Sequence, residues 1–229
     1  MIDKLRRYIR RLTNPILWRI YKWYLSKNRW YHYEGLKIKV APSVFHPGLL
    51  FSTKILVRFV LELDLKDKKL LELGAGSGLI AAAANRAGAK VLASDINPVA
   101  VESMKESKIT NSLSLDIIES DLFNAISSQT FDYIIINPPY FPQVANSDRE
   151  KAFFCGENFE YFHRLFADMP AYLAENSVVY MILSDDCAID RMQEISKTEA
   201  SFDWKLVHEE KVWGETNFIF ELKNKKPTL

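Results

Sequence analysis

Strand-length apolar runs alternate with helical segments from about residue 68, and this alternation limits the possible folds more than any other feature. The clearest runs are Lys69–Leu73, Lys90–Asp95 and Phe131–Ile136. The last run is nearly all apolar, as is typical of a central parallel strand buried on both faces. Helical segments over 80–87 and 98–108 lie between the early runs. This pattern predicts a parallel sheet with helices on both faces.

The later part of the chain adds further strands. We expect strands over 114–119 and 177–183, with helices over 158–175 and 188–197. The runs 204–209 and 217–222 have no helix between them, only a turn at Trp213 and Gly214, so we expect an antiparallel pair. We therefore predict an α/β domain over residues 40–222. Its Rossmann-like, seven-stranded mixed sheet has the order 3-2-1-4-5-7-6, with the last strand antiparallel.

Composition excludes several protein classes. Hydrophobic residues make up 48% of the 229 residues and charged residues 26%, which excludes a disordered chain. No apolar run approaches the roughly 18 residues of a transmembrane helix. The two cysteines, Cys155 and Cys187, form no disulfide framework, and the four histidines form no metal motif. We expect a cytoplasmic protein without a metal site.

Charge is distributed unevenly along the chain. Residues 1–39 contain eleven Lys or Arg residues and two acidic residues, whereas residues 40–229 contain nineteen and twenty-seven. Apolar residues in the first segment recur at helical spacing, and aromatic residues follow among the basic ones. We therefore expect residues 1–39 to form a basic, aromatic helical arm that contacts a polyanion, and residues 223–229 to form a basic tail. Alternatives are that the arm packs on the body of the protein or lies on a membrane surface.

A glycine-rich turn closes the first strand of the predicted sheet. Its spacing is G-x-G-x-G over Gly74–Gly78, which differs from the G-x-G-x-x-G of dinucleotide-binding turns. Glu72 precedes these glycines, and a carboxylate there repels a phosphate but suits a cation, such as the sulfonium and ammonium groups of S-adenosylmethionine. Asp95 ends the next strand, where an acidic side chain accepts hydrogen bonds from ribose hydroxyls.

The tetrapeptide Asn137–Tyr140, with the sequence NPPY, follows the apolar run 131–136 directly. Ligands of open parallel sheets bind beyond the carboxyl ends of the strands. The Asn137 amide oxygen and the Pro138 carbonyl can each accept a hydrogen from one NH₂ group. Tyr140 can stack on the planar system that carries this amine. We therefore expect Asn137, Pro138 and Tyr140 to position a planar nitrogen for methylation.

These motifs together resemble those of class I S-adenosylmethionine-dependent methyltransferases. The tetrapeptide resembles the branches that methylate amines or amides: HemK-type glutamine methyltransferases of release factors, and adenine- or guanine-amine methyltransferases of RNA or DNA. The resemblance covers roughly residues 41–222. It implies an acidic residue, Asp121, that contacts the adenine, and a segment around Phe45 and Thr53 that caps the cofactor. The cofactor-binding residues it implies are Phe45, Thr53, Glu72, Gly74, Ala75, Gly76, Gly78, Asp95, Ile96, Asp121, Leu122 and Asn137.

The predicted function is methyl transfer from S-adenosylmethionine to an RNA base amine or to a protein glutamine amide. The expected partner is accordingly RNA or a translation-related protein. One alternative is a non-catalytic binding module that keeps the fold. Another is a membrane-surface-associated methyltransferase of a small molecule. The segment 141–158 is long for a loop, so we expect it to act as a substrate lid.

Overall fold

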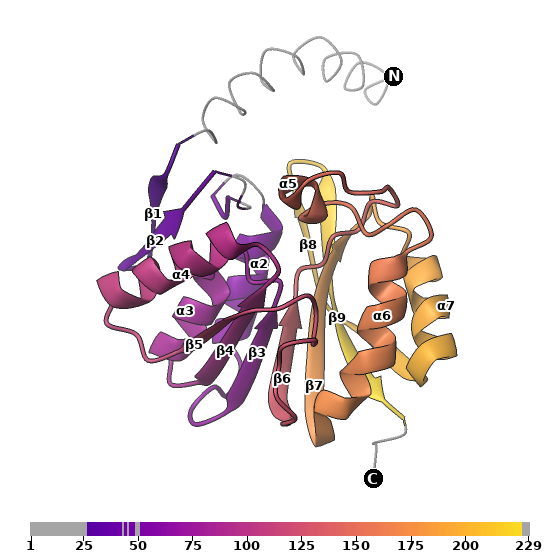
Figure 1. Cartoon of the computed structure of the whole chain (residues 1–229). Coiled ribbons are helices and arrows are strands. Elements are labelled where there is room, and N and C mark those ends of the chain that lie inside the picture. Colours follow the sequence, from indigo (N-terminus) through magenta and orange to yellow (C-terminus); the bar gives the residue numbers. More distant parts are fainter. Residues whose placement is uncertain (1–26, 43, 45, 49–50, 226–229) are drawn as a thin grey trace.

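The computed structural model describes residues 27–42, 44, 46–48 and 51–225. Its main sheet has seven strands in the order β5-β4-β3-β6-β7-β9-β8 (Figure 1). Only β9 runs antiparallel to the others. The predicted strand order and the antiparallel last strand are therefore confirmed. The strands are β3 (Lys69–Leu73), β4 (Lys90–Asp95), β5 (Asp116–Glu119), β6 (Phe131–Ile136), β7 (Leu173–Ser184), β8 (Phe202–Val212) and β9 (Glu215–Asn224).

Helices cover both faces of the sheet and form two hydrophobic cores. One core packs against α2 (Phe51–Leu61), α3 (Leu79–Arg86) and α4 (Pro98–Thr110). The other packs against α6 (Glu160–Asp168), the 3₁₀ turn Met169–Tyr172 and α7 (Ile189–Ala200), which lie on the opposite side in Figure 1. Strand β6 supplies Ile135 to the first core and Ile134 and Ile136 to the second, and all three are fully buried. The central position predicted for this strand is thus confirmed.

The predicted helical arm is wrong for its last part. Residues 29–40 form a β-hairpin of β1 (Arg29–Tyr33) and β2 (Leu36–Val40), which turns at Glu34 and Gly35, both with positive φ. Alternate residues of β2 are buried, so a period of two replaces the expected helical period. The predicted boundary between residues 39 and 40 therefore falls inside a strand. Residues 1–26 lie outside the described part of the chain, as do residues 226–229 of the predicted tail.

The hairpin is attached to α4 through backbone groups of β2. The Lys39 N–H donates to the Ser107 hydroxyl at 2.8 Å, and the Lys37 N–H donates to the Asn111 side-chain oxygen at 2.9 Å. The Asn111 amide nitrogen donates back to the Lys37 carbonyl at 2.8 Å. These bonds satisfy one edge of the hairpin, which therefore packs on the body of the domain.

Two further elements differ from expectation. The predicted helix over 158–175 is shorter, because Pro170 lacks the N–H that would continue an α-helix; a 3₁₀ turn follows α6, and β7 already begins at Leu173. Helix α2 starts at Phe51, so Thr53 lies on a first helical turn where a loop was expected. In addition, the short helix α5 (Asp148–Lys151) interrupts the expected loop over 141–158.

We predict that the core around α6 contributes strongly to stability. Phe166 is fully buried, with its ring 5.7 Å from that of Phe202 and 6.0 Å from that of Trp204. Phe166→Ala should lower the free energy of unfolding by about 3–5 kcal/mol, because it removes a large ring and leaves a cavity. Urea unfolding at constant m-value measures this. Ile109→Ala, at a 78% exposed position on α4, is the control and should change stability by less than about 0.5 kcal/mol.

Candidate active site

A cavity of about 590 Å³ opens at the carboxyl ends of β3, β4, β5 and β6. Most of the predicted site residues lie in its wall, although they come from segments up to 87 positions apart in the sequence. Phe45 lies outside the described residues, and Gly78 is not part of the wall. The predicted residues that line the cavity are Thr53, Glu72, Gly74, Ala75, Gly76, Asp95, Ile96, Asp121, Leu122, Asn137, Pro138 and Tyr140.

The glycine turn requires backbone conformations that other residues rarely adopt. Gly74, Gly76 and Gly78 have φ values of 70°, 53° and 70°. A Cβ at Gly78 would lie 2.7 Å from the Met104 side chain, whereas one at Gly74 would meet nothing within 4 Å. Gly78 thus allows α3 to approach α4, while Gly74 and Gly76 bring the backbone to the cavity.

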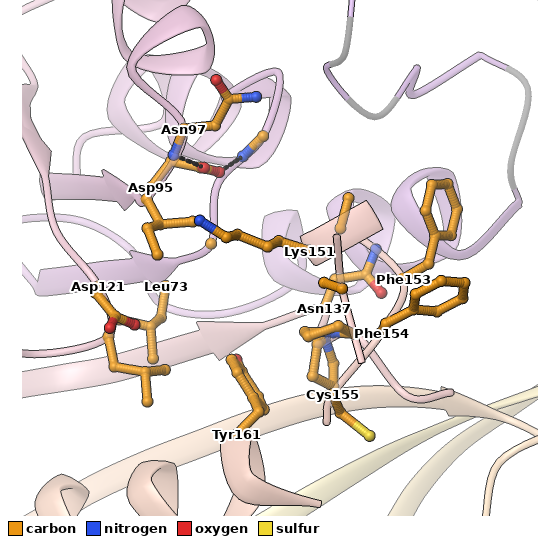
Figure 2. A pocket seen from close by; sticks show the side chains of 18 of the residues that line it. Leu73, Asp95, Asn97, Asp121, Asn137, Lys151, Phe153, Phe154, Cys155 and Tyr161 are labelled. Atoms are coloured by element: carbon orange, nitrogen blue, oxygen red, sulfur yellow. Dashed lines mark hydrogen bonds between the residues drawn. The ribbon is translucent and has the colours of Figure 1, made fainter. Parts of the chain in front are cut away.

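Asp95 is held by the backbone on both sides. One carboxylate oxygen accepts from the Gly76 N–H at 2.7 Å and the other from the Asn97 N–H at 2.8 Å (Figure 2). Burial raises the pKa of Asp95 above its ordinary value, and the N–H groups of Asn97, Gly76 and Ile96 oppose this rise. The Gly76 and Asn97 bonds occupy two of the roughly four acceptor positions of the carboxylate. The carboxylate is therefore fixed at the cavity wall with acceptor capacity for paired hydroxyl groups.

Glu72 is a second buried acidic residue of the site. Its side chain is buried, and one carboxyl oxygen accepts from the Ala81 N–H in α3 at 2.6 Å. Burial raises its pKa to about 8; the Ala81 hydrogen bond lowers it, and the charge of Asp95 raises it further. The group is therefore mostly protonated at pH 7, and a cation in the cavity would favour its ionised form.

The NPPY corner lies on the other side of the cavity from Asp95 and Asp121 (Figure 2). The Asn137 amide nitrogen lies 3.4 Å from the Ser52 hydroxyl of α2, to which it donates. In this orientation the side-chain oxygen of Asn137 is the atom left for an incoming donor. Burial raises the pKa of Tyr140 to about 12, with the Cys187 thiol next in effect. Tyr140 is thus a neutral phenol rather than a base.

The segment after the NPPY corner forms part of the cavity wall. The N–H groups of Tyr140 and Phe141 both donate to the Phe153 carbonyl, at 3.1 and 2.9 Å, and the Cys155 N–H donates to the Phe141 carbonyl at 2.9 Å. The segment thus folds back on the corner through backbone bonds. That it acts as a substrate lid stays a prediction.

Sequence reasoning missed several cavity residues, because no motif marks them. They lie on the segment after the corner and on α6, and their shared signal is an abundance of aromatic and charged residues downstream of NPPY. Those residues are Lys151, Phe153, Phe154, Glu157, Glu160, Tyr161 and Arg164.

Cys155 and His46 have structural roles here. The Cys155 thiol lies 3.3 Å from the Phe141 carbonyl, to which it donates, and burial raises its pKa to about 11. The thiol therefore stays protonated and weakly nucleophilic. The buried His46 ring accepts from the Gly48 N–H at 3.1 Å, and His46 is not part of the cavity wall. Across the described residues, no three His, Cys, Asp or Glu side chains gather as a metal site.

The comparisons with known proteins agree with this geometry. A candidate protein N5-glutamine methyltransferase of Methanocaldococcus jannaschii is 38% identical over 160 residues, which cover 66% of this chain and 77% of that protein. The release factor glutamine methyltransferase of Lactococcus lactis is 38% identical over 114 residues, covering 48% of this chain and 41% of that enzyme. This chain thus spans less than half of the Lactococcus enzyme.

Solved structures share the fold at lower identity. A T. thermophilus 16S rRNA N2 methyltransferase, in complex with AdoMet and guanosine, aligns with a TM-score of 0.62 and 19% identity, covering 87% of this chain and 50% of that one. Residues 35–191 of this chain match the methyltransferase small domain family, which is more than half of its length. The chain therefore belongs to the methyltransferase small domain family.

Proposed function

We propose that the protein transfers a methyl group from S-adenosylmethionine to a planar amine or amide nitrogen. The observation that carries this proposal is the position of Asn137, which directly follows β6 at the cavity that Glu72 and Asp95 also line. The carboxyl groups in the cavity wall suit a positively charged sulfonium donor. The amide oxygen of Asn137 can accept a hydrogen bond from the NH₂ group that is methylated.

The residues present fit this cofactor by their chemistry. Asp95 has acceptor capacity for two ribose hydroxyls, and Glu72 suits the positive methionine portion. The backbone at Gly74 leaves room for close approach. When bound, S-adenosylmethionine supplies an electrophilic methyl group on sulfur.

The acceptor nitrogen is held by this chain's own oxygens. A conjugated NH₂ group is a poor nucleophile, because its lone pair is delocalised. Two acceptors, the Asn137 side-chain oxygen and the Pro138 carbonyl, orient both of its hydrogens and favour a more pyramidal nitrogen. Neutral Tyr140 then covers the planar group without removing a proton. Catalysis by this arrangement is positioning and electrostatic stabilisation, without a covalent enzyme intermediate.

The acceptor is an RNA base amine or a protein glutamine amide. Support comes from the relatives: some are named for glutamine methylation, and others for methylation of ribosomal RNA or ribosomal protein L11. Radiolabelled S-adenosylmethionine, incubated with the protein and separate total RNA and total protein fractions, tests this proposal. Label in one fraction identifies the acceptor class, and absence of label from both would overturn the proposal in favour of a non-catalytic module.

The basic N-terminal segment supports a polyanionic partner. Eleven basic residues among the first 39 favour contact with RNA, for example ribosomal RNA beside the acceptor, in a cytoplasmic setting. In the described part of the chain, no helix is long and apolar enough to cross a bilayer.

We predict cofactor binding that depends on Asp95. Calorimetry should show one site per chain for S-adenosylmethionine, and Asp95→Ala should abolish measurable binding, because it removes the ribose acceptor and releases the Gly76 turn. Asp203→Ala, at an exposed position on β8, is the control and should bind normally. Preferential binding of a nicotinamide dinucleotide would contradict the cofactor assignment.

We predict that cofactor binding releases a proton from Glu72. Its pKa of about 8 in the empty protein means that a cationic ligand must shift the group toward its ionised form. Affinity should therefore rise between pH 6 and 7.5, by up to about tenfold per pH unit. Calorimetry in buffers of different ionisation enthalpy measures the released proton. Glu72→Gln should remove this proton release, and an unchanged release would show that another group titrates.

We predict that Asn137→Ala lowers the rate of methyl transfer but hardly changes the affinity for the cofactor. Cofactor affinity should stay within a few-fold, while turnover on the labelled fraction should fall by about 10²–10³, because one preorganised polar contact to the reacting nitrogen is lost. Single-turnover label transfer measures the rate. Normal turnover of this variant would remove the NPPY corner from the mechanism.

A further inference from the structure

An ion pair at the cavity wall is not explained by the residues assigned so far. The Arg164 guanidinium on α6 donates to one carboxylate oxygen of Asp121 at 2.8 Å. Both residues line the cavity, although 43 positions separate them in the sequence. Their side chains are 46% and 41% exposed. Ion pairs with this exposure contribute little to stability. The effect of this contact is therefore to fix the position of the Asp121 carboxylate.

The turn that carries Asp121 is held in an unfavourable conformation. Leu122, the next residue, has a φ of 51°, which is costly for a side chain of this kind. The Ser120 hydroxyl donates to the Leu122 carbonyl at 2.8 Å and accepts from the Ala125 N–H at 3.0 Å. Strained residues of this type persist where surrounding contacts determine them, and they cluster at ligand sites. The backbone therefore fixes Asp121 from one side, and Arg164 fixes its carboxylate from the other.

The position of Asp121 relative to Asp95 indicates what the carboxylate meets. Asp95 is paired with Glu119 of β5 in the sheet register. Asp121 thus lies two residues beyond that pair, in the turn that follows β5, the strand next to β4. With the ribose on Asp95, the attached base extends toward the end of β5. Arg164 occupies one oxygen of Asp121, which leaves the other as an acceptor toward the cavity.

Helix α6 also contributes Tyr161 to this part of the wall. Tyr161 and Arg164 are three positions apart, so they lie on one face of the helix, and Tyr161 lies near Asp121 in Figure 2. Burial raises the pKa of Tyr161, and the charges of Asp95 and Asp121 add to the rise. A neutral phenol and a guanidinium thus lie on this part of the wall, and the guanidinium of Arg164 pairs with Asp121.

We propose that Arg164 is a positioning residue for adenine recognition: it holds Asp121 so that the second carboxylate oxygen accepts a hydrogen from the 6-amino group of the cofactor's base. This inference rests on the proposed function, because it requires that the cavity binds S-adenosylmethionine. The guanidinium suits the task, since its planar fork orients a carboxylate better than the point charge of a lysine does.

Calorimetry with two probes tests the proposal without any methyl acceptor. S-adenosylhomocysteine carries the 6-amino group, and S-inosylhomocysteine has a carbonyl oxygen in its place. The wild-type protein should bind the adenosyl compound at least tenfold more tightly. Arg164→Gln should weaken the adenosyl compound about five- to tenfold and barely change the inosyl compound, so that discrimination is lost. Arg164→Lys should retain part of the discrimination between the two compounds. In the double variant, Arg164→Gln should cause no loss of affinity beyond that of Asp121→Asn alone.

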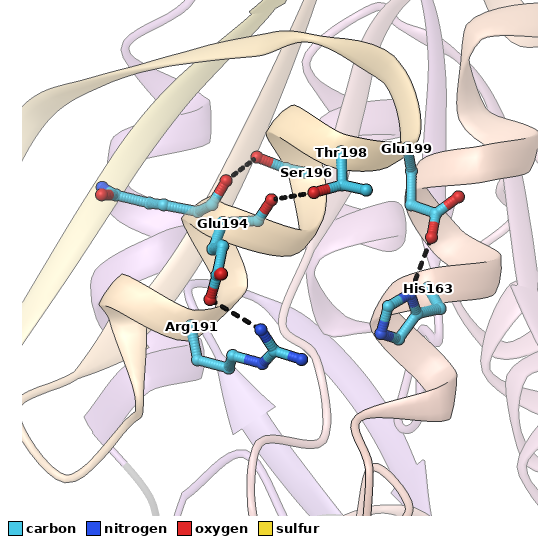
Figure 3. A network of polar contacts seen from close by, with 7 residues as sticks. His163, Arg191, Glu194, Ser196, Thr198 and Glu199 are labelled. Carbon is cyan, nitrogen blue, oxygen red and sulfur yellow. Dashed lines mark hydrogen bonds and ion pairs between the residues drawn. The ribbon is translucent and has the colours of Figure 1, made fainter.

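A second exposed arginine pair provides the matched control. Arg191 on α7 donates to Glu194 at 2.6 Å, on a helix that contributes no residue to the cavity wall (Figure 3). Arg191→Gln should leave both affinities unchanged, and thermal melting should show that all variants are folded. If Arg164→Gln weakened the affinity for both probes equally, or for neither, the role of Arg164 would be overturned while the proposed function would stand. A wild-type protein that binds neither probe would overturn the proposed function and this inference together.

Discussion

The candidate site depends on the two backbone hydrogen bonds that Asp95 accepts. They join the turn after β3, through Gly76, to the start of α4, through Asn97. A single carboxylate thus sets the relative positions of two loops that belong to different βα units. Glycine adopts the φ of 53° that directs the Gly76 N–H toward it without the steric cost that a side chain adds. The cavity wall, the approach of the backbone and the proposed ribose contact all follow from this one arrangement.

Burying two carboxyl groups at one cavity carries a stability cost that the protein reduces by protonation. Burial raises the pKa values of both Glu72 and Asp95, and the charge of Asp95 raises the pKa of Glu72 further. The folded protein binds a proton at Glu72 that the unfolded chain releases above about pH 4.5, so this group's contribution to stability falls as pH rises from there to about 8. A cationic ligand removes the penalty, which couples the proposed cofactor to stability as well as to catalysis.

The sequence predicts the centre of the fold better than its margins, for physical reasons. Strands such as Lys90–Asp95 and Phe131–Ile136 are predicted with the bounds that the structure has, because their centres are apolar and buried. Helix α2 is not predicted from the sequence, because Thr53, Ile55 and Val57 are β-branched and have low helix propensity. Packing of these buried side chains, rather than propensity, makes the segment helical. Asn137 is predictable from the motif that follows a buried strand. The partnership of Arg164 with Asp121 is not, since only tertiary structure brings α6 to the end of β5.

The docking of the β1–β2 hairpin on α4 has a consequence for synthesis of the chain. Strand β2 emerges from the ribosome first, but its partners Ser107 and Asn111 lie 68 and 74 positions later than the residues they bind. At translation rates of about 5–20 residues per second, the interval is about 3–15 s. During that time Leu36, Ile38 and Val40, which are buried in the finished protein, have no helix to cover them. The nascent hairpin therefore cannot pack on its domain until α4 has been synthesised. During this interval its apolar surface is available to a chaperone.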